Sequence, residues 1–127
     1  MKANAKARSA PAVLVVDDDK AIRAFLSEVL ADEGFRVKTA VNGRTALDLL
    51  ATGFRPCVIL LDLMMPVMDG WQFRQAQAGN AALADIPVIV VSAAGKDLLR
   101  RIEANAYLSK PVDLDELLGC VTQFCRP

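Results

Sequence analysis

The stretch VILLD at residues 58–62 puts one carboxylate directly after four apolar residues. The stretch VLVVDDD at residues 13–19 repeats this arrangement with three carboxylates. Apolar runs without polar alternation are typical of strands that a parallel sheet buries on both faces. Because the carboxyl ends of parallel strands meet at one edge of a sheet, we expect Asp17, Asp18 and Asp62 to gather there, where α/β proteins place their sites.

Strands and helices alternate along the rest of the chain. The expected strands cover residues 13–16, 35–40, 57–61, 88–91 and 106–108. The expected helices run from about 20 to 33, between 43 and 53, from 71 to 79, over 97–103 and from 114 to 124. Five strand–helix repeats with right-handed crossovers predict an α/β fold, a doubly wound five-stranded parallel sheet in the order 2-1-3-4-5.

Helical spacing of apolar residues predicts which helix faces are buried. The first helix is expected to bury Ile22, Phe25, Leu26, Val29 and Leu30. The last helix is expected to start after a capping Asp113 and to bury Leu114, Leu117, Leu118, Val121 and Phe124.

Composition and charge limit the class of protein. The chain has 127 residues and 54% hydrophobic content, which suits one domain over residues 11–127 after a flexible basic tail at 1–10. Fifteen basic and fifteen acidic residues cancel, so we expect no direct binding of nucleic acid or of an anionic membrane. No apolar stretch approaches the ~20 residues of a membrane span.

The cysteine and histidine content bears on redox state and on catalysis. Cys57, Cys120 and Cys125 are odd in number and lack metal-ligand spacing, so we expect buried or idle thiols in a reducing cytoplasm. Histidine is absent, which excludes a histidine-based triad and makes a zinc site unusual.

Five chemically capable side chains follow the ends of four expected strands. They are Asp17, Asp18, Asp62, Ser92 and Lys110. Carboxylate oxygens suit Mg²⁺, and Mg²⁺ with the Lys110 ammonium would offset the negative charge around Asp62. A carboxylate oxygen so placed can attack a phosphoryl group and form an acyl phosphate, while the Ser92 hydroxyl donates to a phosphoryl oxygen.

Four stretches together resemble the receiver domain of two-component response regulators, over residues 12–125. They are VLVVDDDKAIR, VILLDLMMPVMDGW, VIVVSAA and AYLSKP, and the second and fourth are highly specific in combination. The resemblance implies a flavodoxin-like (βα)5 fold of the single-domain chemotaxis type.

The resemblance also implies roles for individual residues. Asp62 is similar to the phosphoacceptor, and Lys110 to the lysine that contacts the phosphate. Mg²⁺ would be held by Asp17, Asp18, Asp62 and the backbone carbonyl of Met64. Ser92 and Tyr107 match the family's switch hydroxyl and switch aromatic. In the family the bond from this lysine to the next proline is often cis, which predicts a cis Lys110-Pro111 bond.

Receivers of this type take a phosphoryl group from a phosphohistidine on a partner. The resemblance therefore implies a histidine kinase or a histidine phosphotransfer protein as donor, and a downstream protein target that the sequence does not identify. It implies no enzyme activity beyond the chain's own phosphorylation and dephosphorylation. Met1 and the tail slightly favour a stand-alone receiver over a domain cut from a longer protein.

One region departs from the family pattern. The stretch from Ser92 to Lys110 is 18 residues, several fewer than is usual in the family, so we expect a fourth helix that is about two turns or less, or partly disordered. This keeps open a receiver-like interaction module that is never phosphorylated.

Two other classes share part of the pattern. Asp-x-Asp after a strand also occurs in haloacid-dehalogenase-type phosphatases, in which Asp17 would be the nucleophile, but the chain lacks a cap insertion. A flavin-binding module needs a hydroxyl- or glycine-rich loop after the first strand, where Asp17 and its two acidic neighbours would repel the phosphate.

Overall fold

The computed structural model describes residues 10–95 and 101–125 of the chain. Five strands form one parallel sheet, in the order β2-β1-β3-β4-β5. The strands are β1 (Ala12–Val16), β2 (Arg36–Ala40), β3 (Val58–Leu61), β4 (Val88–Ser92) and β5 (Ala106–Ser109). The predicted fold and strand order are confirmed.

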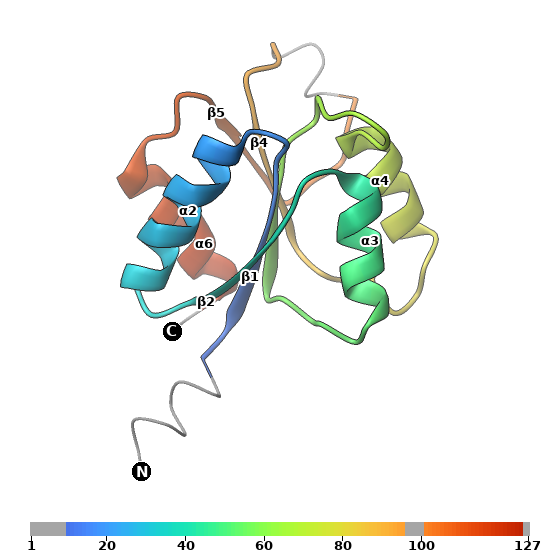
Figure 1. The fold of residues 1–127 in the computed structure, drawn as a ribbon, viewed down its shortest axis with the longest axis horizontal. Coiled ribbons are helices and arrows are strands. Elements are labelled where there is room, and N and C mark those ends of the chain that lie inside the picture. Colours follow the sequence, from blue (N-terminus) through green and yellow to red (C-terminus); the bar gives the residue numbers. More distant parts are fainter. Residues whose placement is uncertain (1–9, 96–100, 126–127) are drawn as a thin grey trace.

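Four helices cover the two faces of the sheet in the described part of the chain (Figure 1). They are α2 (Lys20–Asp32), α3 (Gly43–Ala51), α4 (Gly70–Ala78) and α6 (Leu114–Phe124). Helices α2 and α6 lie on one face, and α3 and α4 on the other (Figure 1). None of the helices in the described ranges is long and apolar enough to cross a membrane.

Polar side chains fix where each helix begins. Asp19 accepts from the backbone N–H groups of the first turn of α2, and Asp113 accepts from Glu116 N at 3.0 Å at the start of α6. Asn42 and Asp69 form reciprocal capping boxes at α3 and α4. Gly34, with φ 98°, ends α2 in a conformation that other residues rarely adopt.

The core has two halves, one on each side of the sheet, because continuous apolar strands present side chains to both faces. The half under α3 and α4 contains Leu14, Ile59, Leu61, Phe73, Val88, Val90 and Ile102 among its buried members. The half under α2 and α6 contains Val13, Leu26, Leu30, Leu60, Ile89, Leu117 and Val121. This rigid centre holds the ends of the strands in place.

Three expectations about burial and pairing are wrong. Phe25 is 47% exposed and Leu114 is also exposed, because the buried stripes of α2 and α6 are narrower than the apolar stripe in the sequence. Cys57 and Cys125 are joined in a disulfide, so they are not idle thiols. The two cysteines are 68 positions apart in the chain, and no local sequence pattern predicts a disulfide over such a separation.

The expected helix over residues 97–103 falls mainly on residues 96–100, which lie outside the described residues. Of the remainder, Arg101, Ile102 and Glu103 are described and are not helical.

Candidate phosphoacceptor site

The register of the sheet brings the two carboxylate stretches together. Strands β1 and β3 are neighbours, with Val16 opposite Leu61. The backbone N–H of Asp62 donates to Val16 O at 2.9 Å, one residue before Asp17. Both side chains are therefore placed at the same edge of the sheet, as predicted, and both are buried.

Lys110 lies between these two carboxylates. Its Nζ donates to Asp17 Oδ2 at 2.8 Å and is 3.3 Å from Asp62 Oδ2. The lysine reaches this position because β5 pairs with β4, where Ser92 lies opposite Ser109 and Lys110 N donates to Ser92 O at 3.1 Å. The Lys110-Pro111 peptide bond that follows is cis, as expected.

The two oxygens of Asp62 have different surroundings. Oδ1 accepts from the backbone N–H of Leu63 at 2.8 Å, while Oδ2 faces Lys110. Burial raises the pKa of the Asp62 carboxyl above its usual range, and the nearby Asp17 charge raises it further, although Lys110 and the Leu63 N–H act in the opposite direction. The charges and donors around Asp62 therefore stabilise its ionised form only in part.

The Lys110 ammonium stays protonated in this environment. Burial lowers its pKa, but the hydrogen bond to Asp17 and the charges of Asp62 and Asp17 outweigh burial, so the pKa lies above its ordinary value. Among the residues that the structure describes, Lys110 forms ion pairs with both buried carboxylates, Asp17 and Asp62.

The carboxylates themselves offer a place for a cation. Asp17, Asp18 and Asp62 can each supply one oxygen, and these three oxygens all lie within 4.8 Å of one another. Asp18 is exposed, whereas the other two are buried, so one side of this cluster is open to solvent. A donor set made only of oxygens suits a hard divalent cation such as Mg²⁺.

The other site residues that the sequence predicts are Ser92, Tyr107 and Met64. The Ser92 side chain is buried at the end of β4, and its Oγ accepts from Ala94 N at 3.1 Å. Met64 lies in the loop after Asp62 with 62% of its surface exposed. Tyr107 on β5 is 43% exposed and so occupies an outward position.

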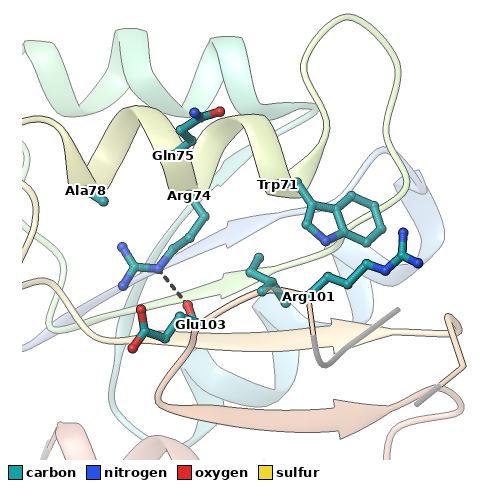
Figure 2. A pocket seen from close by; sticks show the side chains of 7 residues that line it. Trp71, Arg74, Gln75, Ala78, Arg101 and Glu103 are labelled. Atoms are coloured by element: carbon teal, nitrogen blue, oxygen red, sulfur yellow. Dashed lines mark hydrogen bonds between the residues drawn. The ribbon is translucent and has the colours of Figure 1, made fainter. Parts of the chain in front are cut away.

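The Tyr107 hydroxyl contacts the connection between β4 and β5. It donates to Ile102 O at 2.5 Å and accepts from Ala104 N at 3.2 Å. Arg74 of α4 also contacts this connection, because its Nε donates to Glu103 O at 2.9 Å (Figure 2). Residues 102–104, which lie at the described end of the connection from β4 to β5, are therefore bonded to both α4 and β5.

A hollow of about 320 Å³ opens beside this contact. Its lining residues are Trp71, Arg74, Gln75, Ala78, Arg101, Ile102 and Glu103 (Figure 2). It is separate from the carboxylate cluster, because none of the residues that line it belongs to that cluster.

Three supporting residues were missed as members of the site. Gly70 approaches the Asp62 loop so closely that a Cβ there would lie 2.5 Å from Asp62 O. Arg23 donates from its guanidinium to Asp17 O at 2.8 Å, and Asp19 N donates to Asp17 Oδ1 at 2.9 Å. Gly70 is the first residue of α4, after the N-cap Asp69, and its close approach to the Asp62 loop depends on tertiary packing.

Comparison with known proteins agrees with this geometry. The family model described as the response regulator receiver domain matches residues 13–122. In solved structures, the chain is similar to the chemotaxis protein CheY4 of Vibrio cholerae, with a TM-score of 0.82, 31% identity, and coverage of 91% of this chain and 99% of that one. It is also similar to the receiver domain of a signal transduction histidine kinase from Syntrophus aciditrophicus, with a TM-score of 0.83, 29% identity, and coverage of 91% and 89%.

Among curated relatives, the transcriptional regulatory protein PrrA of Mycobacterium leprae is 43% identical over 93% of this chain and 51% of its own length. The DNA-binding dual master transcriptional regulator RpaA of Synechocystis sp. is 37% identical over 91% and 49%. The chain thus spans about half the length of these relatives.

These relatives correct one expectation. Charge balance led us to expect no direct binding of nucleic acid, yet RpaA is named as a DNA-binding regulator and PrrA as a transcriptional one. Net charge describes only the attraction of the whole chain for a polyanion, and says nothing about the regulators in which such domains occur. The matched family model and the shared fold are decisive for the chain itself: it belongs to the response regulator receiver domain family.

Proposed function

We propose that this protein accepts a phosphoryl group on Asp62 in a two-component phosphorelay. The observation that carries the proposal is the position of Lys110, held by Asp17 and 3.3 Å from Asp62 Oδ2. That position places a positive charge beside the oxygen that would react, while Asp17, Asp18 and Asp62 converge around a space suited to a cation.

The chemistry follows from the two unlike oxygens of Asp62. The Leu63 N–H holds Oδ1, which leaves Oδ2 as the oxygen that forms the bond to phosphorus. As that bond forms, the bond from phosphorus to the donor breaks, and its electron pair leaves with the donor. Lys110 stabilises the negative charge on the transferring phosphoryl group, and Ser92 supplies a hydroxyl donor once the group has arrived.

Mg²⁺ would be held by Asp17, Asp18, Asp62 and the Met64 carbonyl, and when bound it would neutralise charge on the transferring phosphoryl oxygens. The negative charges of Asp17, Asp18 and Asp62 would repel an incoming anion until a bound cation offsets them. The raised pKa of Asp62 supports this requirement, because burial and Asp17 together make the ionised form costly.

The phosphoryl donor would be a phosphohistidine on a histidine kinase or a histidine phosphotransfer protein. The chain has no histidine of its own, so it would receive the group and not originate it. The reaction would be confined to its own phosphorylation and dephosphorylation. A cytoplasmic location would give it access to such donors.

Phosphorylation would act on the partner surface through a shift of population between two conformations. The Ser92 hydroxyl would lose the hydrogen bond that it accepts from Ala94 N and would donate a hydrogen bond to a phosphoryl oxygen instead. The strand-end loop would then move, and Tyr107 could leave its outward position. A protein target that recognises this surface would read the change.

Incubation with Mg²⁺ and acetyl phosphate tests the proposal, with intact mass as the readout. The native chain is expected to gain the mass of one phosphoryl group, and Asp62→Asn is expected to gain none. A native chain that binds Mg²⁺ but gains no mass would contradict the proposal and favour an interaction module that is never phosphorylated.

A further inference from the structure

The disulfide between Cys57 and Cys125 lies away from the carboxylate cluster. Cys57 immediately precedes β3, and Asp62 immediately follows it, so the two residues lie at opposite ends of the same strand. Cys125 caps the carboxyl end of α6. The bond therefore fastens the last turn of α6 to the edge of the sheet opposite the acidic residues.

The two sulfur-bearing residues differ in exposure. Cys125 is 3% exposed and belongs to the half of the core that contains Leu117 and Val121. Cys57 is partly exposed at the start of β3. Cys57 is therefore the more accessible of the two cysteines, whereas Cys125 is buried in the core.

The third cysteine offers a comparison within the same helix. Cys120 is free and only partly buried on α6. Burial raises the pKa of its thiol, and the charge of Glu116 raises it further, so little of the reactive thiolate is present at neutral pH. Exposure alone thus does not make Cys120 a competing site.

We propose that Cys57 and Cys125 form a reversible thiol–disulfide site that responds to low-molecular-weight disulfides such as glutathione disulfide. Disulfides in a reducing compartment are mostly transient or redox-sensing, and a partly exposed cysteine paired with a buried one suits stepwise exchange, in which the more accessible residue reacts first. Cys57 is the residue that reacts first, and Cys125 is the residue that resolves.

The exchange balances in two steps. The Cys57 thiolate attacks glutathione disulfide, forms a mixed disulfide and releases one glutathione thiolate. The Cys125 thiolate then attacks the Cys57 sulfur, which closes the internal disulfide and releases the second glutathione. The two cysteines are oxidised, one glutathione disulfide is reduced to two thiols, and the two protons of the cysteine thiols pass to the released thiolates or to solvent.

The second step is favoured by geometry in the folded chain. The Cα atoms of Cys57 and Cys125 are 5.6 Å apart, within the usual span of a disulfide. The α6 turn that carries Cys125 is itself fixed, because Cys125 N donates to Val121 O at 2.9 Å and Val121 is fully buried. A mixed disulfide on Cys57 therefore has its resolving thiol already in place.

The order of reaction is tested by trapping the mixed disulfide. Reduced protein is mixed with glutathione disulfide, quenched with acid and weighed intact. The native chain and Cys120→Ser are expected to lose two hydrogens and retain no glutathione. Cys125→Ser and Cys125→Ala are expected to retain one glutathione on Cys57, whereas Cys57→Ser is expected to react at least tenfold more slowly.

Two results would overturn the proposal. One is a native chain that retains glutathione, on Cys120 or elsewhere, without closing the internal bond. The other is a Cys125 variant, shown to be folded by circular dichroism, that acquires no adduct on Cys57.

The structural effect is tested by thermal unfolding with and without a reductant. The disulfide joins residues that are 68 positions apart and so restricts the unfolded chain. Reduction of this disulfide should therefore lower Tm by on the order of 10 °C. The double variant Cys57→Ser with Cys125→Ser should show no response to reductant, while Cys120→Ser should respond like the native chain. Equal Tm values for oxidised and reduced native protein would contradict a disulfide that fastens α6.

Discussion

Lys110 and Asp17 are 93 positions apart in the chain, and their side chains are joined by a hydrogen bond of 2.8 Å. Asp17 is buried and fixed by β1, so this bond determines where the ammonium lies. The same ammonium is 3.3 Å from Asp62 Oδ2. Asp17 thus has two roles in our account, as a candidate cation ligand and as the residue that positions Lys110 beside the proposed phosphoacceptor.

Replacement of Lys110 by Met should destabilise the protein when no divalent cation is present. The change leaves Asp17 and Asp62 buried side by side without their ammonium, which typically costs about 3 kcal/mol. Urea unfolding measures the loss, and added Mg²⁺ should recover part of it. Lys20→Met, at an exposed lysine, is the control and should change stability by less than about 0.5 kcal/mol. Equal stability of the two variants would contradict the pairing.

Replacement of Asp62 by Asn should stabilise the protein at neutral pH. The folded-state pKa of Asp62 is raised above 3.8, so the folded chain binds more protons than the unfolded chain between that value and the raised pKa. Stability from this group therefore falls as pH rises through that window, and the loss is complete above it. The amide removes the titration and should therefore raise stability at pH 7.

Thermal unfolding from pH 4 to pH 8 checks this prediction. The difference between Asp62→Asn and the native chain should grow with pH in the absence of Mg²⁺ and shrink when Mg²⁺ is added. Asp85→Asn, at an exposed carboxylate, is the matched control. A stability difference between the variant and the native chain that shrinks as pH rises would contradict a raised pKa for Asp62.

Replacement of Gly70 by Ala should disturb the loop that carries Asp62. The new Cβ would lie 2.5 Å from Asp62 O and 2.8 Å from Leu63 Cα, both backbone atoms that cannot move away cheaply. We expect a loss of about 2 kcal/mol in stability and weaker Mg²⁺ binding. Calorimetric titration with Mg²⁺ measures the second effect.

Gly119→Ala provides the opposite case in the same protein. Gly119 lies inside α6 with nothing within 4 Å of an added Cβ, so alanine should stabilise the helix by roughly 0.5–1 kcal/mol. A Gly70→Ala variant that is as stable as the native chain would contradict the close approach.

Replacement of Gln77 by Leu should loosen the segment after α4. Gln77 is fully buried, and its Nε2 donates to Leu83 O and Ile86 O, both at 2.9 Å. Leucine fills the space but leaves both carbonyls without this donor, at a cost of about 2–3 kcal/mol. Urea unfolding should show the loss for Gln77→Leu and almost none for Gln75→Leu, at an exposed position on the same helix.

Much of the site was predictable because its members follow uninterrupted apolar strands. The runs before Asp17 and Asp62 fix both the buried sheet and the edge at which the acids meet. The order of the strands then places Lys110 beside them, and the receiver resemblance supplied the cis bond before Pro111.

What escaped prediction depends on tertiary distance. The pairing of Cys57 with Cys125 joins residues that no local pattern links, and an odd cysteine count favours idle thiols. Phe25 follows the helical apolar spacing, but spacing does not tell how wide a stripe the sheet can cover. The close approach of Gly70 to Asp62 O arises from packing between the start of α4 and the loop after β3, which no local sequence pattern specifies.

Chemical mapping of the modified residue tests the central claim most directly. After incubation with Mg²⁺ and acetyl phosphate, borohydride reduction converts an aspartyl phosphate to homoserine, which peptide mass spectrometry locates in the chain. Our account predicts homoserine at position 62 and at no other position. Homoserine at position 17, or at neither position in a protein shown to bind Mg²⁺, would contradict it.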